Sequence, residues 1–178
     1  MPRSRSALAP PTYTFRVRIL GGGYAPPNAP QIWREIELAS NQTLADLGEA
    51  IPDAFDFDDP HLWAFFLSGK PWDERTEYAL DPQPSPFGGR RPKAADRLPI
   101  RETPGKEFLY IFDFGDEWHF GVKLVRTSDQ LERGAHYPRI VTRHGESPPQ
   151  YPDLDDDEDD EEQEEDEQDE DLAETERD

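Results

Sequence analysis

The sequence predicts an α+β fold, with one main helix packed across a face of a mixed β-sheet in a β-grasp-like arrangement, plus disordered termini. Three observations predict it. An alternating apolar segment follows residue 12, one segment has helical periodicity near residue 45, and several short apolar runs come later. The expected order is strand, strand, helix, strand, long loop, strand, strand.

The first two strands are expected to form a hairpin with a long connection. Residues 13–20 alternate between apolar and polar side chains, as in a strand with one buried face. Three glycines at 21–23 end this strand, and three prolines keep the following connection irregular. Residues 32–38 are the expected partner strand.

Residues 43–55 are expected to form the helix. Thr43 suits the N-cap, and Asp46 three residues later resembles a capping box. Apolar residues recur at helical spacing over this segment and give it one apolar face. Pro52 comes late in the pattern, so we expect it to kink or end the helix near Ile51.

The remaining elements are two strand regions separated by a long loop. Residues 61–67 are apolar on both faces, as expected of a central strand. Residues 68–106 are rich in Pro and Gly, and a loop of this length is typical of functional or disordered segments. Residues 108–126 predict a hairpin turning at 113–117, and residues 137–141 a short edge strand.

The negative charge of the chain is concentrated in its last residues. The formal net charge is −21, but residues 152–178 hold 19 acidic residues and one basic residue, so the rest is nearly neutral. Such a segment cannot bury enough apolar surface to offset its chain entropy, so we expect a disordered acidic tail. We expect a disordered N-terminus at 1–11 and one folded domain at 12–151.

Several classes of protein are disfavoured by what the sequence lacks. The chain has no cysteine, which excludes disulfides, thiolate metal sites and cysteine nucleophiles. It has neither an apolar run long enough to span a bilayer nor a secretory signal pattern. No phosphate loop, nucleophile elbow or dinucleotide fingerprint is present. We expect a cytoplasmic monomer without a cofactor or a membrane partner, and the absences disfavour an ordinary enzyme.

Polar residues gather around the expected turn at 113–117. Asp113, Asp116 and His119, together with His61 before the central strand, are candidate residues for a ligand or partner site. They are also the candidate metal ligands, if a metal is bound, because carboxylates and imidazoles bind divalent ions. The alternative is a purely structural turn, in which short acidic residues flank a glycine.

The long loop adds two further candidates. Trp72 lies in loop sequence, where an aromatic side chain could anchor a partner or cover the core. A basic cluster follows, and with the nearby Phe87 it could follow a phosphate backbone; the alternative is a solvated loop. The residues of this candidate polyanion-binding loop are Arg90, Arg91, Lys93 and Arg97.

Several segments together resemble the plasmid pRiA4b Orf-3-like domain family over about residues 12–150. The most specific is Asp113-Phe-Gly-Asp-Glu-Trp118, which follows an apolar run from Phe108. The others are Ile32–Ile36, Thr43–Leu47, His61–Phe65, Tyr137–Arg139 and Gly145–Pro149. The resemblance implies a compact α+β domain without a settled activity. Some members carry the name of insertion-element passenger proteins of resolvase type, but this chain has no serine supported by clustered arginines.

The chain departs from the commoner pattern of that family at three places. Trp63 and Phe120 stand where many members have histidine, and Pro148-Pro149 leads to Gln150 where many members have a cysteine-containing segment. If those histidines and cysteines bind metal in the relatives, this chain has lost part of the set.

Three functions follow from these observations. The first is a non-enzymatic binding or accessory domain, associated with mobile-element or nucleic-acid processes, whose acidic tail modulates its contacts. The second is a metal-dependent enzyme that acts on nucleic acid through the His/Asp cluster. The third is an interaction protein whose tail engages basic partners. The partner, a nucleic acid or a protein, is not specified by the sequence.

Overall fold

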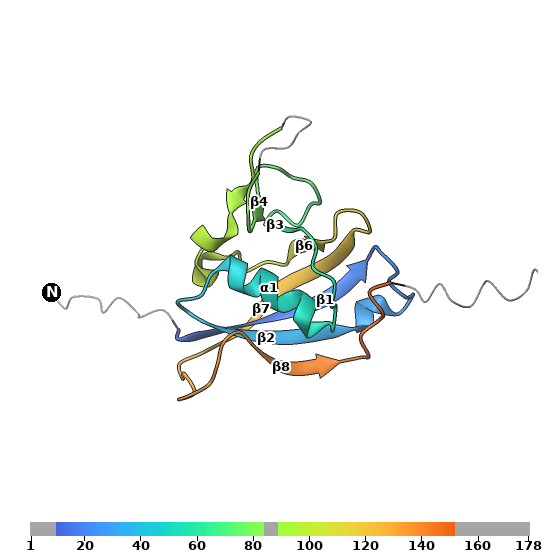
Figure 1. Ribbon diagram of the computed structural model, residues 1–178. Coiled ribbons are helices and arrows are strands. Elements are labelled where there is room, and N and C mark those ends of the chain that lie inside the picture. Colours follow the sequence, from blue (N-terminus) through green and yellow to red (C-terminus); the bar gives the residue numbers. More distant parts are fainter. Residues whose placement is uncertain (1–9, 84–88, 152–178) are drawn as a thin grey trace, which may run out of the picture.

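One eight-stranded sheet with α1 (Leu44–Ala54) across one face forms the domain (Figure 1). This computed structural model describes residues 10–83 and 89–151, so the predicted tail and most of the predicted N-terminal segment lie outside it. The strand order is β5-β4-β3-β6-β7-β1-β2-β8. The strands are β1 (Thr12–Gly21), β2 (Trp33–Ala39), β3 (Trp63–Phe66), β4 (Glu77–Ala79), β5 (Lys93–Ala94), β6 (Phe108–Phe112), β7 (Trp118–Ser128) and β8 (Arg139–His144). The predicted α+β class is confirmed.

The two predicted hairpins form the centre of the sheet. β1 pairs with β2, and β6 with β7, each pair antiparallel. β1 also pairs with β7, which joins the two hairpins into one sheet. The short β4 and β5 are parallel, so the sheet is mixed as expected. Three 3-10 helices, η1 (Ala29–Gln31), η2 (Ala95–Arg97) and η3 (Ile100–Glu102), lie in the connections.

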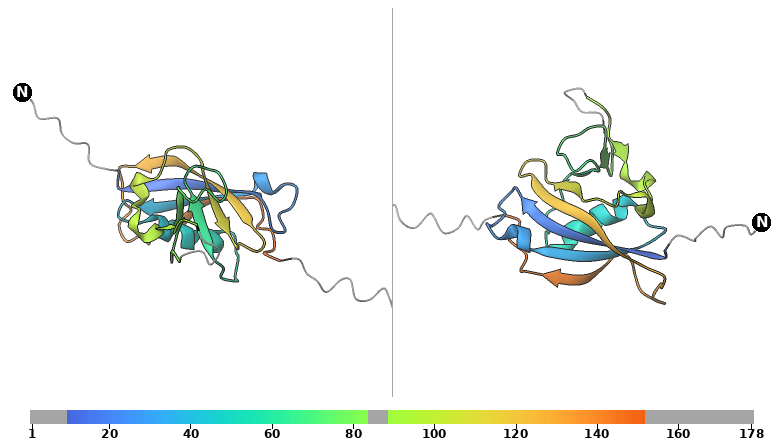
Figure 2. Two further views of the ribbon diagram at one scale, coloured as in Figure 1. Left: turned by 90° about the horizontal axis from the view of Figure 1, so that it is seen from above. Right: turned by 180° about the vertical axis from the view of Figure 1, so that it is seen from behind.

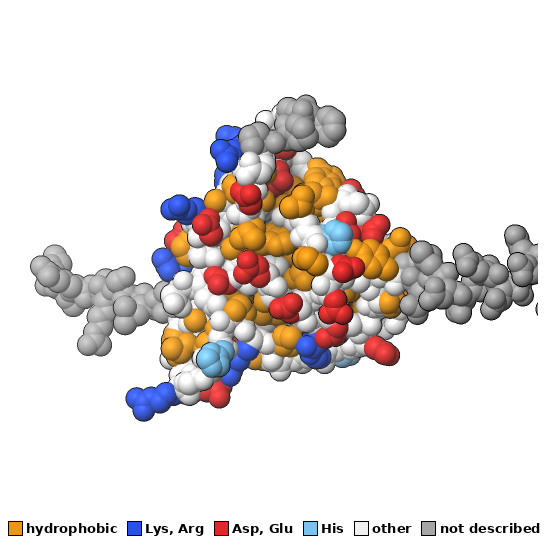
Figure 3. Space-filling model, in the orientation of Figure 1, with side chains coloured by type: hydrophobic (Ala, Val, Ile, Leu, Met, Phe, Trp, Pro, Cys, Tyr) orange, Lys and Arg blue, Asp and Glu red, His pale blue; other side chains and the backbone are white. Residues whose placement is uncertain are grey.

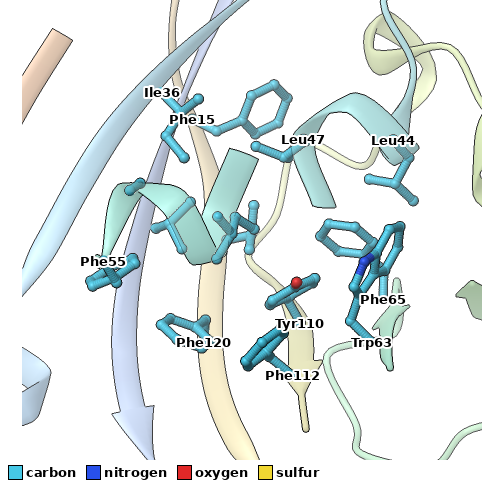
Figure 4. Close-up of a cluster of buried hydrophobic side chains, with 14 of the residues drawn as sticks. Phe15, Ile36, Leu44, Leu47, Phe55, Trp63, Phe65, Tyr110, Phe112 and Phe120 are labelled. Carbon is cyan, nitrogen blue, oxygen red and sulfur yellow. The ribbon is translucent and has the colours of Figure 1, made fainter. Parts of the chain in front are cut away.

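The core lies between α1 and the sheet and is rich in aromatic rings. Figure 4 shows Leu47 of α1 among the same buried cluster as side chains from several strands, which include Phe15, Ile36 and Tyr110. The rings of Phe65 and Tyr110 have centroids 4.7 Å apart. Each such side chain contributes about 1.5–3 kcal/mol when fully buried, and this burial holds the helix on the sheet.

The start of α1 matches the predicted capping box. Asp46 Oδ2 accepts hydrogen bonds from Thr43 N at 2.7 Å and from Thr43 Oγ1 at 2.8 Å. The helix has 11 residues, about half of what a bilayer span requires, and the described part of the chain contains no membrane-spanning helix.

The helix agrees with the predicted span 43–55, and of the two expectations for Pro52, a kink or an end near Ile51, the end is not seen, because α1 continues through Pro52 to Ala54. A proline at position 52 has no N–H to donate to the carbonyl of Gly48 four residues earlier. In the fold, the buried hydroxyl of Tyr110 on β6 donates to Gly48 O at 2.9 Å. A side chain from the sheet thus satisfies the carbonyl that the proline leaves unpaired.

Other predicted boundaries differ from the structure at the edges of the sheet. The segment at 68–106 was expected to be a loop, yet it supplies β4 and β5. The predicted strand at 61–67 is shortened to β3, which leaves His61 in the connection before it. The edge strand expected at 137–141 runs from Arg139 to His144. These strands are short, so pairing with a neighbour decides their bounds more than local pattern does.

The sheet face opposite α1 has no helix among the described residues, as the view from behind shows (Figure 2). Charged pairs cover much of this face. Arg16 donates to Glu35 Oε1 at 2.8 Å, and Arg139 lies 2.8 Å from Glu37 Oε2. The guanidinium of Arg16 also stacks over the ring of Trp33 at 4.2 Å.

The substitution Tyr110→Phe tests the pairing between the sheet and the helix carbonyl. We expect it to lower the free energy of unfolding by about 1–3 kcal/mol, because Gly48 O is then buried without a donor. The cost should shrink in a Pro52→Ala background, because an alanine at that position restores the helical N–H donor. Urea denaturation of the wild type, the two single variants and the double variant measures the coupling. Equal costs in the two backgrounds would contradict this account.

Candidate functional site

The turn between β6 and β7 depends on Asp113. This residue is 7% exposed and has a left-handed backbone with φ of 57°. Its Oδ1 accepts hydrogen bonds from Gly115 N at 3.0 Å and from Asp116 N at 3.4 Å. One carboxylate oxygen therefore closes the turn, as short acidic residues commonly do, and leaves the other oxygen for contacts outside it.

The second oxygen of Asp113 faces two other side chains. Oδ2 lies 3.6 Å from His61 Nδ1 and 3.4 Å from the Tyr151 hydroxyl. The same hydroxyl forms a hydrogen bond of 2.6 Å with His61 Nε2. A phenol can donate one hydrogen bond and also accept, so Tyr151 can bond both side chains at once, with the imidazole tautomer setting the direction of the bond to His61. We call His61, Asp113 and Tyr151 the His–Tyr–Asp cluster. The two predicted residues lie together, and Tyr151 completes the set.

A network centred on Arg34 brings Tyr151 to this position. Arg34 is 2% exposed, and its Nη2 donates to Ser147 Oγ at 2.7 Å. Ser147 Oγ in turn donates to Asp56 Oδ2 at 2.7 Å. Farther along, the Gln150 side chain exchanges two hydrogen bonds with the backbone of Asp59, each of 3.1 Å. These contacts fix the segment from Gly145 to Tyr151 against the chain between α1 and β3.

The environment of Tyr151 raises the pKa of its phenol. Partial burial is the main cause, and the negative charges of Asp113, Asp59 and Asp116 add to it. Asp116 thus influences the cluster through its charge. The phenol is neutral at physiological pH and can act as a hydrogen-bond donor there.

His119 lies apart from the cluster. It follows Trp118, whose side chain is fully buried in the core, so His119 points to the opposite face of the sheet. Its Nε2 lies 3.5 Å from Glu117 Oε2. Within residues 10–83 and 89–151, no three His, Asp or Glu side chains form a group that could hold a metal ion. The predicted set of four metal ligands is therefore not assembled.

Two glycines allow a close approach to the same turn. A Cβ at Gly22 would overlap the carbonyl oxygen of Glu117, and a Cβ at Gly23 would lie 2.5 Å from the ring of Trp118. Both glycines also have positive φ. The predicted strand break at 21–23 thus serves to let the backbone pack on this turn.

A cavity of about 680 Å³ opens beside the cluster. His61 lines it together with four large apolar side chains that solvent reaches, Leu62, Trp72, Leu80 and Phe114. The Trp72 ring packs edge-on against Phe114, with centroids 5.3 Å apart, and against the buried Phe66 at 5.6 Å. Trp72 is 45% exposed, so it both covers part of the sheet and presents an aromatic surface to the cavity.

Acidic side chains from β4 and its flanks also line the cavity. These are Glu74, Glu77 and Asp81. Burial raises the pKa of Glu77, and the charge of Glu74 raises it further. Acidic and hydrophobic side chains intermingle on the molecular face that carries α1, whereas most Lys and Arg side chains there lie toward one margin (Figure 3).

The predicted polyanion-binding residues are spread along the loop that contains β5. Arg90 lines the cavity, whereas Arg91 Nε donates to the carbonyl of Pro82 at 2.6 Å. Lys93 Nζ lies 5.1 Å above the Tyr78 ring, and Arg97 lies 3.8 Å from Asp96. Three of the four cations thus contact groups of this chain. Phe87, the aromatic residue predicted to accompany them, lies outside the described residues.

A family description, the plasmid pRiA4b ORF-3-like protein, matches residues 26–175. The chain belongs to this family. The match begins later than the resemblance seen in the sequence and reaches farther toward the C-terminus. It includes the turn at Asp113, the cavity residues and Tyr151.

Two proteins are similar to this pRiA4b ORF-3-like chain. It is 26% identical over 121 residues to "Uncharacterized protein y4hQ" of Sinorhizobium fredii, covering 68% of this chain and 59% of that protein. The chain therefore spans about three fifths of that relative. A crystal structure of a protein of unknown function, MM3350 from Methanosarcina mazei Go1, is similar with a TM-score of 0.59 and 25% identity. That similarity covers 78% of this chain and 71% of the other.

Reasoning from sequence found His61, Trp72 and Asp113 but missed Tyr151, Arg34 and the cavity acids. Tyr151 directly precedes the acidic tail and belongs to no periodic pattern, so nothing marked it. Arg34 falls in register with Ile32 and Ile36, on the apolar face of the expected strand. A charged residue at such a position was the one sign in the sequence that Arg34 is buried.

Replacing Arg34 with Lys should destabilise the fold strongly. The guanidinium donates five hydrogen bonds, to Ser147 and to the carbonyls of Trp33, Ala54, His144 and Gly145, which one ammonium cannot reproduce. We expect a loss of about 2–4 kcal/mol in the free energy of unfolding. Arg18→Lys is the control, since its exposed pair with Glu107 should cost under about 1 kcal/mol. Equal losses in denaturant titrations would contradict this.

The substitution Tyr151→Phe should remove the contacts to His61 and Asp113 and cost about 1 kcal/mol at pH 8. The phenol pKa is raised in the folded state. The contribution of Tyr151 to stability is therefore fully present below pH about 10 and is lost as the pH rises above that value. Tyr151→Phe should lack this contribution to the decline. Tyr24→Phe is the control, because Tyr24 touches Tyr151 only through its ring, at 6.3 Å. Identical profiles of stability against pH for all three proteins would refute the role of Tyr151.

Proposed function

We propose that this chain is a non-enzymatic binding domain whose ligand site is the cavity between β4 and the β6–β7 turn. The observation that carries the proposal is a set of large apolar side chains that line the cavity and remain open to solvent, Leu62, Trp72, Leu80 and Phe114. A volume of about 680 Å³ lies within the range of small-molecule and cofactor sites. Apolar walls with a few polar groups are the usual composition of such sites.

The His–Tyr–Asp cluster supports a binding role more than a catalytic one. Both ring nitrogens of His61 face groups of the chain itself, Tyr151 at 2.6 Å and Asp113 at 3.6 Å. The cluster therefore holds the C-terminal segment at the edge of the cavity. A metal-dependent enzyme acting on nucleic acid would need His119 beside His61, whereas His119 lies on the opposite face of the sheet.

The other functions predicted from the sequence stay predictions. Association with mobile-element or nucleic-acid processes depends on the resemblance and on the loop cations. Engagement of basic partners by the tail depends on residues 152–178, outside the described residues. The cytoplasmic location and the monomeric state are likewise predictions from the sequence.

Binding of the neutral dye Nile red tests the cavity directly. We expect its fluorescence to increase with the wild-type protein, because apolar walls exclude water from the dye. Leu62→Ala and Trp72→Ala should each weaken binding about threefold or more, as removal of buried apolar contact area predicts. Leu131→Ala is the matched control, because Leu131 is 56% exposed and lies outside the cavity, compared with 72% for Leu62. Equal binding by all four proteins would exclude this site.

A further inference from the structure

The charges around the cavity specify what kind of ligand it would take. Three carboxylates, Glu74, Glu77 and Asp81, line it against one guanidinium, Arg90. The described wall is therefore negative on balance. An anionic ligand would meet repulsion from most of it, whereas a cation would meet attraction.

The aromatic walls of the cavity also favour a cationic ligand. Trp72 and Phe114 present rings to the cavity, and the faces of such rings attract ammonium and guanidinium groups. The tryptophan is held in place by edge-on contacts to Phe66 and Phe114, so its ring is already oriented before a ligand arrives. Little side-chain entropy is then lost on binding.

Glu77 is the carboxylate best placed to pair with a cation. It lies on β4 directly opposite the fully buried Phe66 of β3, and it is half-buried. Among the described residues, no hydrogen bond or ion pair satisfies its carboxylate. Glu74, in contrast, accepts a hydrogen bond from Arg90 N at 3.0 Å. Within residues 10–83 and 89–151, Glu77 therefore has a partly desolvated carboxylate without a counter-ion, which a bound cation would supply.

We propose that the cavity binds an organic cation, an ammonium or guanidinium group on an apolar body, with Glu77 as its counter-ion and Trp72 and Phe114 around the apolar part. This inference rests on the proposed binding function and adds the charge of the ligand. The cationic group belongs either to a free small molecule or to a Lys or Arg side chain of a protein, and the chemistry of recognition is the same for both.

Three compounds of equal apolar body separate the charge from the apolar contribution. These are 4-phenylbutylamine, 4-phenylbutanol and 5-phenylvalerate, each with four methylenes, titrated into the full-length protein by calorimetry. We expect the amine to bind about tenfold more tightly than the alcohol, and the carboxylate to bind most weakly. Raising the salt concentration should weaken binding of the amine and leave the alcohol unchanged.

Glu77→Gln keeps the shape of the side chain and removes its charge. We expect it to reduce the affinity for the amine about tenfold without changing the affinity for the alcohol. It also removes the repulsion from Glu74, so the variant should fold at least as stably as the wild type. Glu146→Gln, an exposed acidic residue outside the cavity, is the matched control. Asp81→Asn gives a second test within the cavity.

The outcomes distinguish the two proposals. If none of the compounds and no Nile red binds, the proposed function fails. If the alcohol binds as tightly as the amine, or the carboxylate binds most tightly, the cavity stands as a binding site and the cation inference is overturned. An acetylated and amidated Phe-Lys-Phe peptide, compared with its Nε-acetyl-lysine form, identifies the source. Tighter binding of the peptide than of the free amine indicates a protein ligand, and the reverse indicates a small molecule.

Discussion

The buried guanidinium of Arg34 is the interaction on which the arrangement of this domain depends. It binds the C-terminal end of α1 through the carbonyl of Ala54, the end of β8 through His144, and the following segment through Gly145 and Ser147. It also stacks over the ring of Phe55 at 4.9 Å. Burial, and secondarily the charge of Arg143, lowers the pKa of this guanidinium, yet arginine keeps its charge in proteins. One buried guanidinium with five hydrogen bonds thus joins three segments of the chain.

The hydrogen bonds of Arg34 position the candidate site. The segment that leaves β8 is held near Asp56 and Asp59, and so Tyr151 meets His61 and Asp113. On the other side of His61, the apolar side chains of the β3–β4 region and Phe114 of the turn enclose the cavity. The site therefore combines parts of the chain as far apart as residues 61 and 151, each fixed by a different structural interaction. Such a combination depends on tertiary structure rather than on any local motif.

Local periodicity accounts for the parts of the fold that the sequence predicts well. The alternating segment before Gly21, the capping box at Thr43 and the turn residues around Gly115 each express a short-range preference, and each element is present. The course of α1 through Pro52 could not be predicted, because the donor that satisfies Gly48 O comes from Tyr110, 62 residues later. The cavity acids escaped prediction for a similar reason. Glu77 matters because it faces Phe66 across a strand pair, and its own neighbours in sequence show no periodicity.

The anchoring of Tyr151 also fixes where the acidic run is attached. The 19 acidic residues from Pro152 onward are tethered to a point beside His61, which lines the cavity. A tethered polyanion concentrates counter-ions in its surroundings, over a screening length of about 8 Å at physiological ionic strength. Within that length of the cavity, acidic charges next to this attachment point would favour the approach of a cation over that of an anion.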